Sequence, residues 1–517
     1  MAEQLALLPG YATAHLQLSL AALVLGVSFS VPVGVWVSRN ERFEPGVLGV
    51  ASVLQTIPSL ALLALMVPVI AGLGILLSGL GIEVRSIGFF PAVVALTLYS
   101  VLPILRNTVT GIGGVDAALV EAASGVGMTD RQRLTRVELP LALPVIVAGV
   151  RTATVWVIGT ATLATPVGAT SLGNYIFSGL QTRNFTAVIV GSVAAALLAM
   201  GLDGLIRLLE RGLVLRSRAR VALALVLLAS LCAYAAGTFL VSSFGSRARP
   251  VLIGAKTFTE QYIVSEILAQ QIAAETQFET RAVQSLGSTV AFDALRTGEI
   301  DLYVDYSGTI WATIMKRPGL PETREAVLEG VRQYLRDEHG IVLVVRFGFE
   351  NTYALAMRQA QARELRVATI SDLVRVAPRL ELGGDYEFFA RAEWKALEKV
   401  YGLNFRAQRS MDAALMYQAA DVGEVDVISA YSTDGRIAAY SLALLVDDRG
   451  VIPPYDAIVL ARPGLATESP EILEALSQLE GRIDEERMQA LNYEVDVGGR
   501  TPADVARDFL EGLSKSP

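Results

Sequence analysis

The chain has 517 residues, of which 52% are hydrophobic and 18% are charged, and its mean hydropathy is +0.47. Soluble domains contain about 25% charged residues, so a purely soluble protein is excluded. Residues 1–248 hold no lysine, 15 arginines and 10 acidic residues, whereas residues 249–517 hold 28 basic and 41 acidic residues. We therefore expect a membrane domain followed by an acidic soluble domain. Because no basic stripe is present, we expect no nucleic-acid partner.

Six apolar stretches are long enough to cross a membrane core, which takes about 20 residues. They lie near 13–37, 47–73, 88–110, 140–165, 185–206 and 221–243. Ten arginines fall in the connections 38–46, 111–139 and 207–220, against only Arg85 and Arg183 in the connections on the other side. Arginine-rich loops stay in the cytoplasm, so the N-terminus and everything after about residue 249 are predicted to lie outside.

The connection 111–139 carries the most specific motif. Glu121-Ala122-Ala123 is followed by Gly127 and then by Val137-Glu138-Leu139-Pro140. Alanine favours a short helix, glycine ends it, and proline opens the next span. The pattern resembles the signature of binding-protein-dependent ABC importer permeases, with valine for isoleucine. The resemblance implies a MetI-like permease core with one extra span, and contact with a separate cytoplasmic ABC ATPase through Glu121, Ala122, Ala123, Gly127, Leu139 and Pro140.

The residues offer no site for catalysis. The segment Gly254-Ala255-Lys256-Thr257 lacks the Gly-Lys pair of a phosphate-binding loop, so the chain is not expected to be its own ATPase. Cys232 is the one cysteine, and His15 and His339 are the two histidines, too few and too scattered for a metal cluster. We expect no enzyme activity, no metal and no cofactor in this chain, with ATP bound by the partner subunits.

From residue 251 onward, short apolar strands alternate with amphipathic helices, which is typical of α/β layers. The expected strands are 251–255, 280–284, 300–305, 341–347, 352–358, 380–383, 404–408, 425–430 and 454–461, and the expected helices are 259–275, 289–298, 322–338, 387–401 and 411–422. About 267 residues in such layers predict two lobes with a cleft between them.

Five blocks in this half resemble the glycine betaine/choline/carnitine class of substrate-binding proteins: Lys256–Gln261, Asp301–Thr309, Asn351–Tyr353, Ala430–Gly435 and Pro453–Asp456. The resemblance implies a two-lobed periplasmic-binding-protein-like (class II) fold. It also implies a tyrosine cage around a trimethylammonium group, made here by Tyr306, Tyr353, Tyr431 and Tyr455. A quaternary cation has no N–H to donate, so aromatic faces are what can recognise it.

The same resemblance implies that Lys256, Thr309 and Arg391 hold a ligand carboxylate, with Arg391 as a bidentate donor. Some betaine binders have an aspartate where this chain has Asn351, so an anionic contribution to the cation site is missing at that position. The expected substrate is a zwitterionic quaternary amine, with glycine betaine first, carnitine, proline betaine and ergothioneine next, and choline also in the set.

These features predict a permease domain over 1–220 with its coupling loop at 111–139, a sixth span and linker over 221–250, and an extracytoplasmic binding domain over 251–517. The predicted protein is the membrane and substrate-binding subunit of a type I ABC importer for quaternary amines. It would be a multi-pass protein of the bacterial inner membrane that pairs with a second copy of itself. The alternative is a ligand-gated channel or a membrane-anchored sensor, neither of which gives the coupling motif a role.

Overall fold

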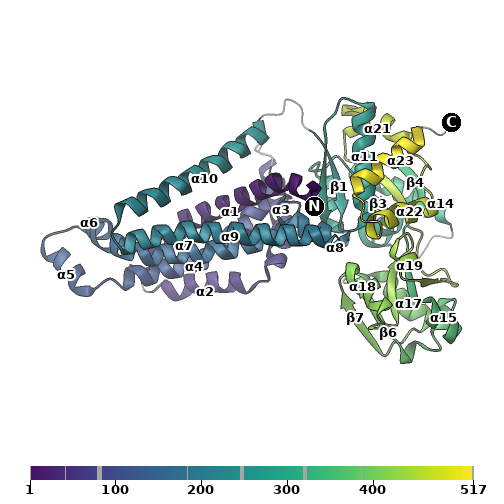
Figure 1. Cartoon of the computed structure of the whole chain (residues 1–517), viewed down its shortest axis with the longest axis horizontal. Helices are drawn as coiled ribbons and strands as arrows, with labels where there is room; N and C mark the ends of the chain where they lie inside the picture. The colour runs from purple at the N-terminus through teal and green to yellow at the C-terminus, as the bar shows by residue number, and fades with distance from the viewer. Residues whose placement is uncertain are drawn as a thin grey trace. The chain divides into compact units, whose positions relative to one another are not determined.

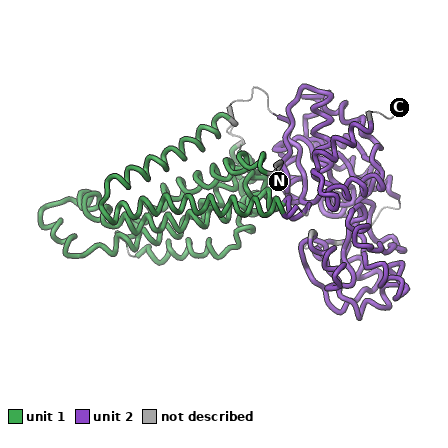
Figure 2. Tube along the Cα trace, in the orientation of Figure 1, with its two compact units in different colours: residues 1–177, 186–247 green, residues 178–185, 248–517 purple. Residues whose placement is uncertain are grey.

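The computed structural model describes residues 2–40, 42–78, 84–182, 184–244, 250–317, 323–385 and 387–514. The chain divides into two compact units (Figure 2), one of residues 1–177 and 186–247 and the other of residues 178–185 and 248–517. The first unit is helical, and the second contains two sheets. The boundaries predicted at residues 220 and 250 stay a prediction.

Long apolar helices build the first unit (Figure 1), because a helix satisfies its own backbone within a membrane. Those long and apolar enough to span include most or all of α1 (Ala2–Val37), α4 (Phe89–Gly113), α7 (Leu139–Ala161), α9 (Phe185–Val214) and α10 (Arg218–Phe244). The other elements are α2 (Glu44–Thr56), α3 (Ser59–Ser78), α5 (Ala117–Gly125), α6 (Asp130–Arg133), a π-helix (Leu134–Glu138), a 3-10 helix (Thr162–Val167) and α8 (Gly173–Gln181).

The stretch expected to span at 47–73 is not a single straight helix. It consists of α2 and α3, whose axes form an angle of 102°. The break falls at Ile57, which is extended with φ −67° and ψ 126°. Pro58 follows it, and proline pushes the preceding residue out of the helical region. The proline was visible in the sequence, but the size of the bend was not predicted.

One ion-pair network indicates how often the bent pair crosses the membrane. Arg39, beyond the end of α1, donates to Glu138, which also accepts from Arg133 Nε at 2.9 Å. Glu138 belongs to the connection with the coupling motif, so the end of α1 lies at the same membrane face as that connection. Because α4 reaches this face from the opposite one, α2 and α3 together cross once. The first unit then has the six crossings that the sequence predicts.

The coupling motif itself lies on an exposed loop. α5 is capped by Asp116, whose carboxylate accepts from the Ala118 backbone N–H at 2.9 Å. Ala123 is buried, whereas Glu121 and Ala122 are exposed. Gly127, two residues past the end of α5, has φ +80°, a left-handed conformation that glycine adopts without strain.

The second unit has two lobes, each built on a five-stranded sheet, as the sequence predicts. The sheet of the first lobe has the order β2-β1-β3-β10-β4, and that of the second lobe has the order β7-β6-β8-β5-β9. Their strands are β1 (Val251–Lys256), β2 (Thr280–Leu286), β3 (Leu302–Tyr306), β4 (Val342–Glu350), β5 (Tyr353–Arg358), β6 (Glu381–Asp385), β7 (Ala407–Met411), β8 (Val427–Tyr431), β9 (Leu442–Leu445) and β10 (Asp456–Ala461).

Helices cover both sheets (Figure 1). The first lobe carries α11 (Thr259–Glu275), α12 (Ser288–Arg296), α13 (Ser307–Thr309), a π-helix (Ile310–Ile314), α14 (Arg324–His339), α20 (Leu465–Glu468), α21 (Pro470–Ser477), α22 (Glu485–Asp496) and α23 (Pro502–Ser514). The second carries α15 (Gln359–Leu365), α16 (Ile370–Leu373), 3-10 helices (Ala377–Arg379 and Phe388–Ala390), α17 (Ala392–Tyr401), α18 (Ala413–Asp421) and α19 (Arg436–Ala439).

The chain passes between the lobes twice. It enters the second lobe between β4 and β5, and it returns between β9 and β10. The strand that follows each passage, β5 or β10, runs antiparallel to both of its neighbours. Two expectations were wrong in this region. β9 was not predicted, and the helix expected from residue 387 begins at Ala392, because residues 388–390 form a 3-10 turn.

Candidate ligand-binding site

All four predicted cage tyrosines stand at strand ends. Tyr306 ends β3, Tyr353 begins β5, Tyr431 ends β8, and Tyr455 immediately precedes β10. The antiparallel pairing of β5 with β8 puts Tyr353 directly opposite Tyr431. Because β3 and β10 belong to the first lobe and β5 and β8 to the second, these strand ends bring residues of both lobes to one place.

The structure brings the four rings into one cluster. The Tyr353 ring centroid lies 5.0 Å from that of Tyr431 and 6.1 Å from that of Tyr455. Phe258 joins Tyr306 to the group, since its ring centroid is 6.1 Å from Tyr306 and 5.8 Å from Tyr431. Phe258 was not among the predicted site residues, although it lies in the Lys256–Gln261 block that signalled the family.

Arg391 lies against this cluster. Its guanidinium carbon is 5.2 Å from the Tyr353 ring centroid, and its Nη2 donates to Glu387 at 2.8 Å. Its Nη1 donates to Thr313 of the first lobe at 3.4 Å, so the contact spans the cleft. Arg391 is the cap residue of α17 in extended conformation, not a helix residue as the predicted 387–401 helix implied. Its Nε is buried and has no hydrogen-bond acceptor within the described chain.

Lys256 and Thr309, the other predicted carboxylate contacts, are buried in the first lobe. The Lys256 ammonium lies 2.5 Å from Asp305 and 5.5 Å from the Tyr306 ring centroid. Asp305 therefore neutralises Lys256 inside the lobe, a pairing that the sequence-based interpretation did not include. Arg391 contacts the tyrosine cluster directly, whereas the charge of Lys256 already has a carboxylate partner.

Glu260 is the most extensively hydrogen-bonded carboxylate beside the cage, and it was not predicted as a site residue. Its Oε1 accepts from the Tyr306 hydroxyl at 2.5 Å and from Asn351 Nδ2 at 3.0 Å. Its Oε2 accepts from the Thr433 hydroxyl at 2.5 Å and from Asn492 Nδ2 at 3.4 Å. Burial raises the pKa of Glu260, and these four hydrogen bonds oppose that rise. The side chain joins both lobes through a single buried group.

Several acceptor atoms near the rings, among them Asn351 Oδ1, Glu393 Oε2 and Asn492 Oδ1, have no donor within the described chain. Asn351 gives its amide nitrogen to Glu260, but its Oδ1 is unpartnered. Glu393 accepts the Tyr455 hydroxyl on Oε1, and its Oε2 is unpartnered although the residue is only 4% exposed. Buried polar atoms are seldom left without a hydrogen bond, so these positions suit a ligand that brings donors.

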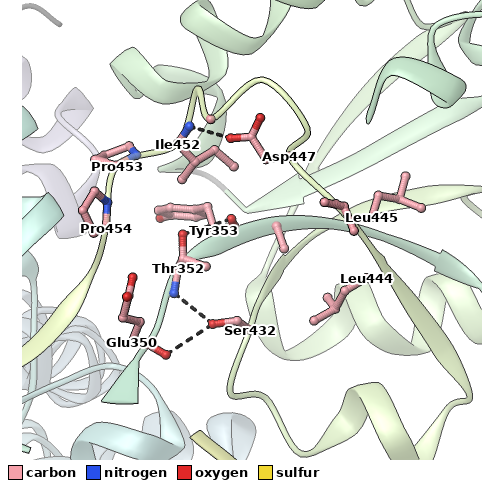
Figure 3. A pocket seen from close by; sticks show the side chains of 13 residues that line it. Glu350, Thr352, Tyr353, Ser432, Leu444, Leu445, Asp447, Ile452, Pro453 and Pro454 are labelled. Atoms are coloured by element: carbon pink, nitrogen blue, oxygen red, sulfur yellow. Dashed lines mark hydrogen bonds between the residues drawn. The ribbon is translucent and has the colours of Figure 1, made fainter. Parts of the chain in front are cut away.

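The binding domain also contains a cavity that is distinct from the tyrosine cage. About 440 Å³ lies between the two interlobe passages (Figure 3), lined by Glu350, Thr352, Tyr353, Ala354, Ser432, Leu444, Leu445, Val446, Asp447, Gly450, Ile452, Pro453 and Pro454. Tyr353 is the one cage residue in its wall. The space beside Phe258, Glu260 and Tyr431 is only about 20 Å³, roughly room for one water molecule.

Comparisons with known proteins identify the family. Residues 249–512 match the substrate binding domain of the ABC-type glycine betaine transport system. Residues 26–215 match the inner membrane component of binding-protein-dependent transport systems. The chain belongs to this family of ABC importers. It is therefore a multi-pass inner-membrane transport subunit with its binding domain outside, and no comparison supports a channel or a sensor.

Relatives of this importer subunit include fused and separate proteins. It is 32% identical over 497 residues to the ergothioneine transport permease/ergothioneine binding protein EgtU of Helicobacter pylori (strain G27), with 94% of this chain and 86% of that protein covered. The choline transport system permease protein OpuBB of Bacillus subtilis (strain 168) is 43% identical over 38% of this chain and 85% of its own length. The carnitine transport binding protein OpuCC of Listeria monocytogenes (serotype 1/2a, strain 10403S) is 34% identical over 52% and 88%.

A glycine provides a test of the Tyr455 position. A Cβ atom at Gly308 would lie 2.7 Å from Cδ2 of the Tyr455 ring, so Gly308→Ala must displace one of the two. Overpacking of this kind costs about 1–3 kcal/mol. We expect urea denaturation of the binding domain to show a loss of unfolding free energy in that range.

Gly512→Ala is the matched control, because Gly512 lies inside α23 and its Cβ would meet nothing within 4 Å. We expect the stability of that variant to be unchanged or to rise by about 0.4–1 kcal/mol. Equal losses in the two variants would contradict the packing of Tyr455 against Gly308.

Proposed function

We propose that this chain, paired with a second copy and with two cytoplasmic ABC ATPase subunits, imports a zwitterionic quaternary amine. ATP is bound by the partner subunits, and this chain carries no cofactor of its own. The tyrosine cluster is the observation that carries the proposal. Its aromatic faces favour a cation that cannot donate a hydrogen bond, at about 0.5–2 kcal/mol for each cation–π contact.

The exposed coupling loop supports an ATPase partner. Leu119 in α5 is 47% exposed, and Val126 just after it is 76% exposed. Apolar side chains on an exposed loop are suited to docking on another protein, while Ala123 packs inward. Arg133 donates to Ser124 at 3.2 Å and to Glu138 at 2.9 Å, which links α5 to the start of α7.

The unpartnered acceptor atoms indicate which of the candidate ligands fits the site best. Asn351 Oδ1 and Glu393 Oε2 suit a ligand with an N–H or O–H donor in addition to its ammonium and carboxylate groups. Carnitine has a hydroxyl and ergothioneine has an imidazole N–H, whereas glycine betaine and proline betaine have no such donor. The likeness over 94% of this chain to an ergothioneine transport permease/binding protein supports ergothioneine, whereas a carnitine-binding and a glycine-betaine-binding protein are equally similar, at 34% identity. We therefore place ergothioneine and carnitine ahead of glycine betaine and proline betaine, and choline last.

The direct test is calorimetry of the binding domain against these five ligands, followed by ATP hydrolysis in liposomes that also contain the ATPase. We expect at least one betaine to bind and to stimulate hydrolysis. Stimulation without any bound betaine, or binding of all five ligands with equal affinity, would contradict the proposed substrate class.

The coupling role predicts a difference between two substitutions of Gly127. Its φ of +80° is strained for a β-branched residue but accessible to asparagine, and a Cβ there meets nothing within 4 Å. We expect Gly127→Val to lose most ligand uptake and Gly127→Asn to retain it, with ligand affinity unchanged in both. Normal uptake by Gly127→Val, with the protein inserted at the usual level, would exclude a coupling role for this conformation.

The proposed contact between Arg391 and the ligand carboxylate predicts that betaines bind more tightly than choline. Choline lacks a carboxylate, so it leaves the buried Arg391 Nε without an acceptor. Hydrogen bonds to charged groups contribute about 1.5–3 kcal/mol, so betaines should bind at least about tenfold more tightly than choline. We expect Arg391→Ala to remove most of this preference while changing choline affinity little. An unchanged ratio of betaine to choline affinity in Arg391→Ala would show that Arg391 does not hold the ligand carboxylate.

A further inference from the structure

Three of the four cage tyrosines donate their hydroxyl to a separate buried carboxylate. Tyr306 donates to Glu260 Oε1 at 2.5 Å, Tyr431 donates to Asp385 Oδ2 at 3.3 Å, and Tyr455 donates to Glu393 Oε1. The three acids are 2%, 6% and 4% exposed, respectively. Tyr353 joins the same set indirectly, because its hydroxyl lies 3.4 Å from that of Tyr431.

Two of these carboxylates have only neutral hydrogen-bond donors. Glu260 is bound by hydroxyl and amide groups, and Asp385 Oδ1 accepts the backbone N–H groups of Glu387 and Phe388 at 2.8 and 2.9 Å. Within the described residues, neither acid takes part in an ion pair. Burial raises the pKa of both acids, because it removes a negative charge from water; at Asp385 the backbone hydrogen bonds and the charge of Arg391 oppose that rise.

The basic groups of the site already have carboxylate partners. Lys256 is paired with Asp305 at 2.5 Å, and Arg391 is paired with Glu387 at 2.8 Å. The Arg391 Nη1 atom is 3.9 Å from Glu393 Oε1, at the limit of an ion pair. In their ionised forms the acids of this site outnumber its basic groups, and a cationic ligand would supply the partner that buried negative charge normally has.

A tyrosine that donates to a carboxylate carries that negative charge at the far edge of its ring. A cation held against the ring face then interacts with the ring and, through it, with the acid behind it. Since protein interiors screen charges less than water does, such an acid still acts across the width of a ring. A neutral ligand of the same shape gains nothing from this charge.

We propose that Glu260, Asp385 and Glu393 are specificity-determining residues, which select a quaternary ammonium over a neutral group of the same size by placing negative charge behind the cage tyrosines. This inference rests on the proposed function. These three acids would supply the anionic contribution that Asn351 does not make.

The test compares a betaine with its carbon analogue, in which a tert-butyl group replaces the trimethylammonium group. The betaine used is the one that binds most tightly in the five-ligand panel. If that is glycine betaine, its analogue is 3,3-dimethylbutanoate. Affinities are measured on the full-length protein in lipid nanodiscs. In Glu260→Gln and in Asp385→Asn, we expect betaine affinity to fall about tenfold or more, which is 1.4 kcal/mol, and analogue affinity to change less than about twofold.

The control is a tyrosine–carboxylate pair on another part of the second lobe. The Tyr401 hydroxyl donates to Asp447 Oδ1 at 2.5 Å, and the Arg449 guanidinium lies 4.9 Å from the Tyr401 ring centroid. Asp447→Asn should leave the ratio of betaine to analogue affinity unchanged. Should Glu260→Gln fail to fold, Tyr431→Phe together with Asp385→Asn makes the same comparison through a different acid.

The outcomes separate this inference from the proposed function. Equal losses for betaine and analogue in Glu260→Gln and Asp385→Asn would mean that the acids only support the fold, and would overturn the inference. An unchanged betaine affinity in both variants would overturn it as well. If no betaine binds to the unaltered protein, the proposed function fails and the inference fails with it.

Discussion

A charge taken out of water has to be given partners, and this constraint organises the binding domain. Glu260 receives four donors, which come from the end of β3, the passage between β4 and β5, the segment after β8, and α22. Each donor belongs to a different part of the chain. Satisfying one buried carboxylate therefore holds both lobes and one passage in register, and it orients Tyr306, a ring of the cage, at the same time.

A buried acid also receives several partners in the membrane unit, where Glu138 connects the end of α1 to the loop that carries the coupling motif. Glu138 is 5% exposed and accepts from arginines at two separate places, Arg39 after α1 and Arg133 at the end of α6. Arg133 also donates to Ser124 at the end of α5. Hydrogen bonds and ion pairs therefore link α5 to the residues that follow the first transmembrane helix. The short π-helix from Leu134 to Glu138 lies where this connection enters α7.

The sequence was most informative where a pattern has one physical solution. The length of the apolar stretches and the arginine placement predicted six crossings, a number that the described helices reach when the bent pair α2–α3 counts as one span. The alternation of strands with helices predicted the two lobes that the structure shows. The block that contains Lys256 and the tyrosine motifs located the cage. Composition could not show that α2 and α3 meet at 102°, because a proline permits a bend without fixing its angle.

The parts of the site that sequence reasoning missed depend on long-range packing. Glu393 and Asp385 lie in no recognised block, and they matter only because folding brings them to Tyr455 and Tyr431. Phe258 and Glu260 lie inside a recognised block, so a search for aromatic and acidic residues within it could have found both. Arg391 was selected correctly as a neighbour of the rings, but its pairing with Glu387 and the pairing of Lys256 with Asp305 are properties of the folded chain.

The raised pKa of Glu260 and of Asp385 links the cage to the proton concentration outside the cell. A cation placed beside a buried carboxyl group favours its ionised form, so an arriving ligand lowers both pKa values. Wherever either carboxyl group is still protonated, capture releases its proton, and acidification within that pH range weakens capture. In that range the heat of capture includes the heat with which the buffer takes up the released protons, so it differs between buffers of unequal ionisation enthalpy while the number of ligands bound stays the same.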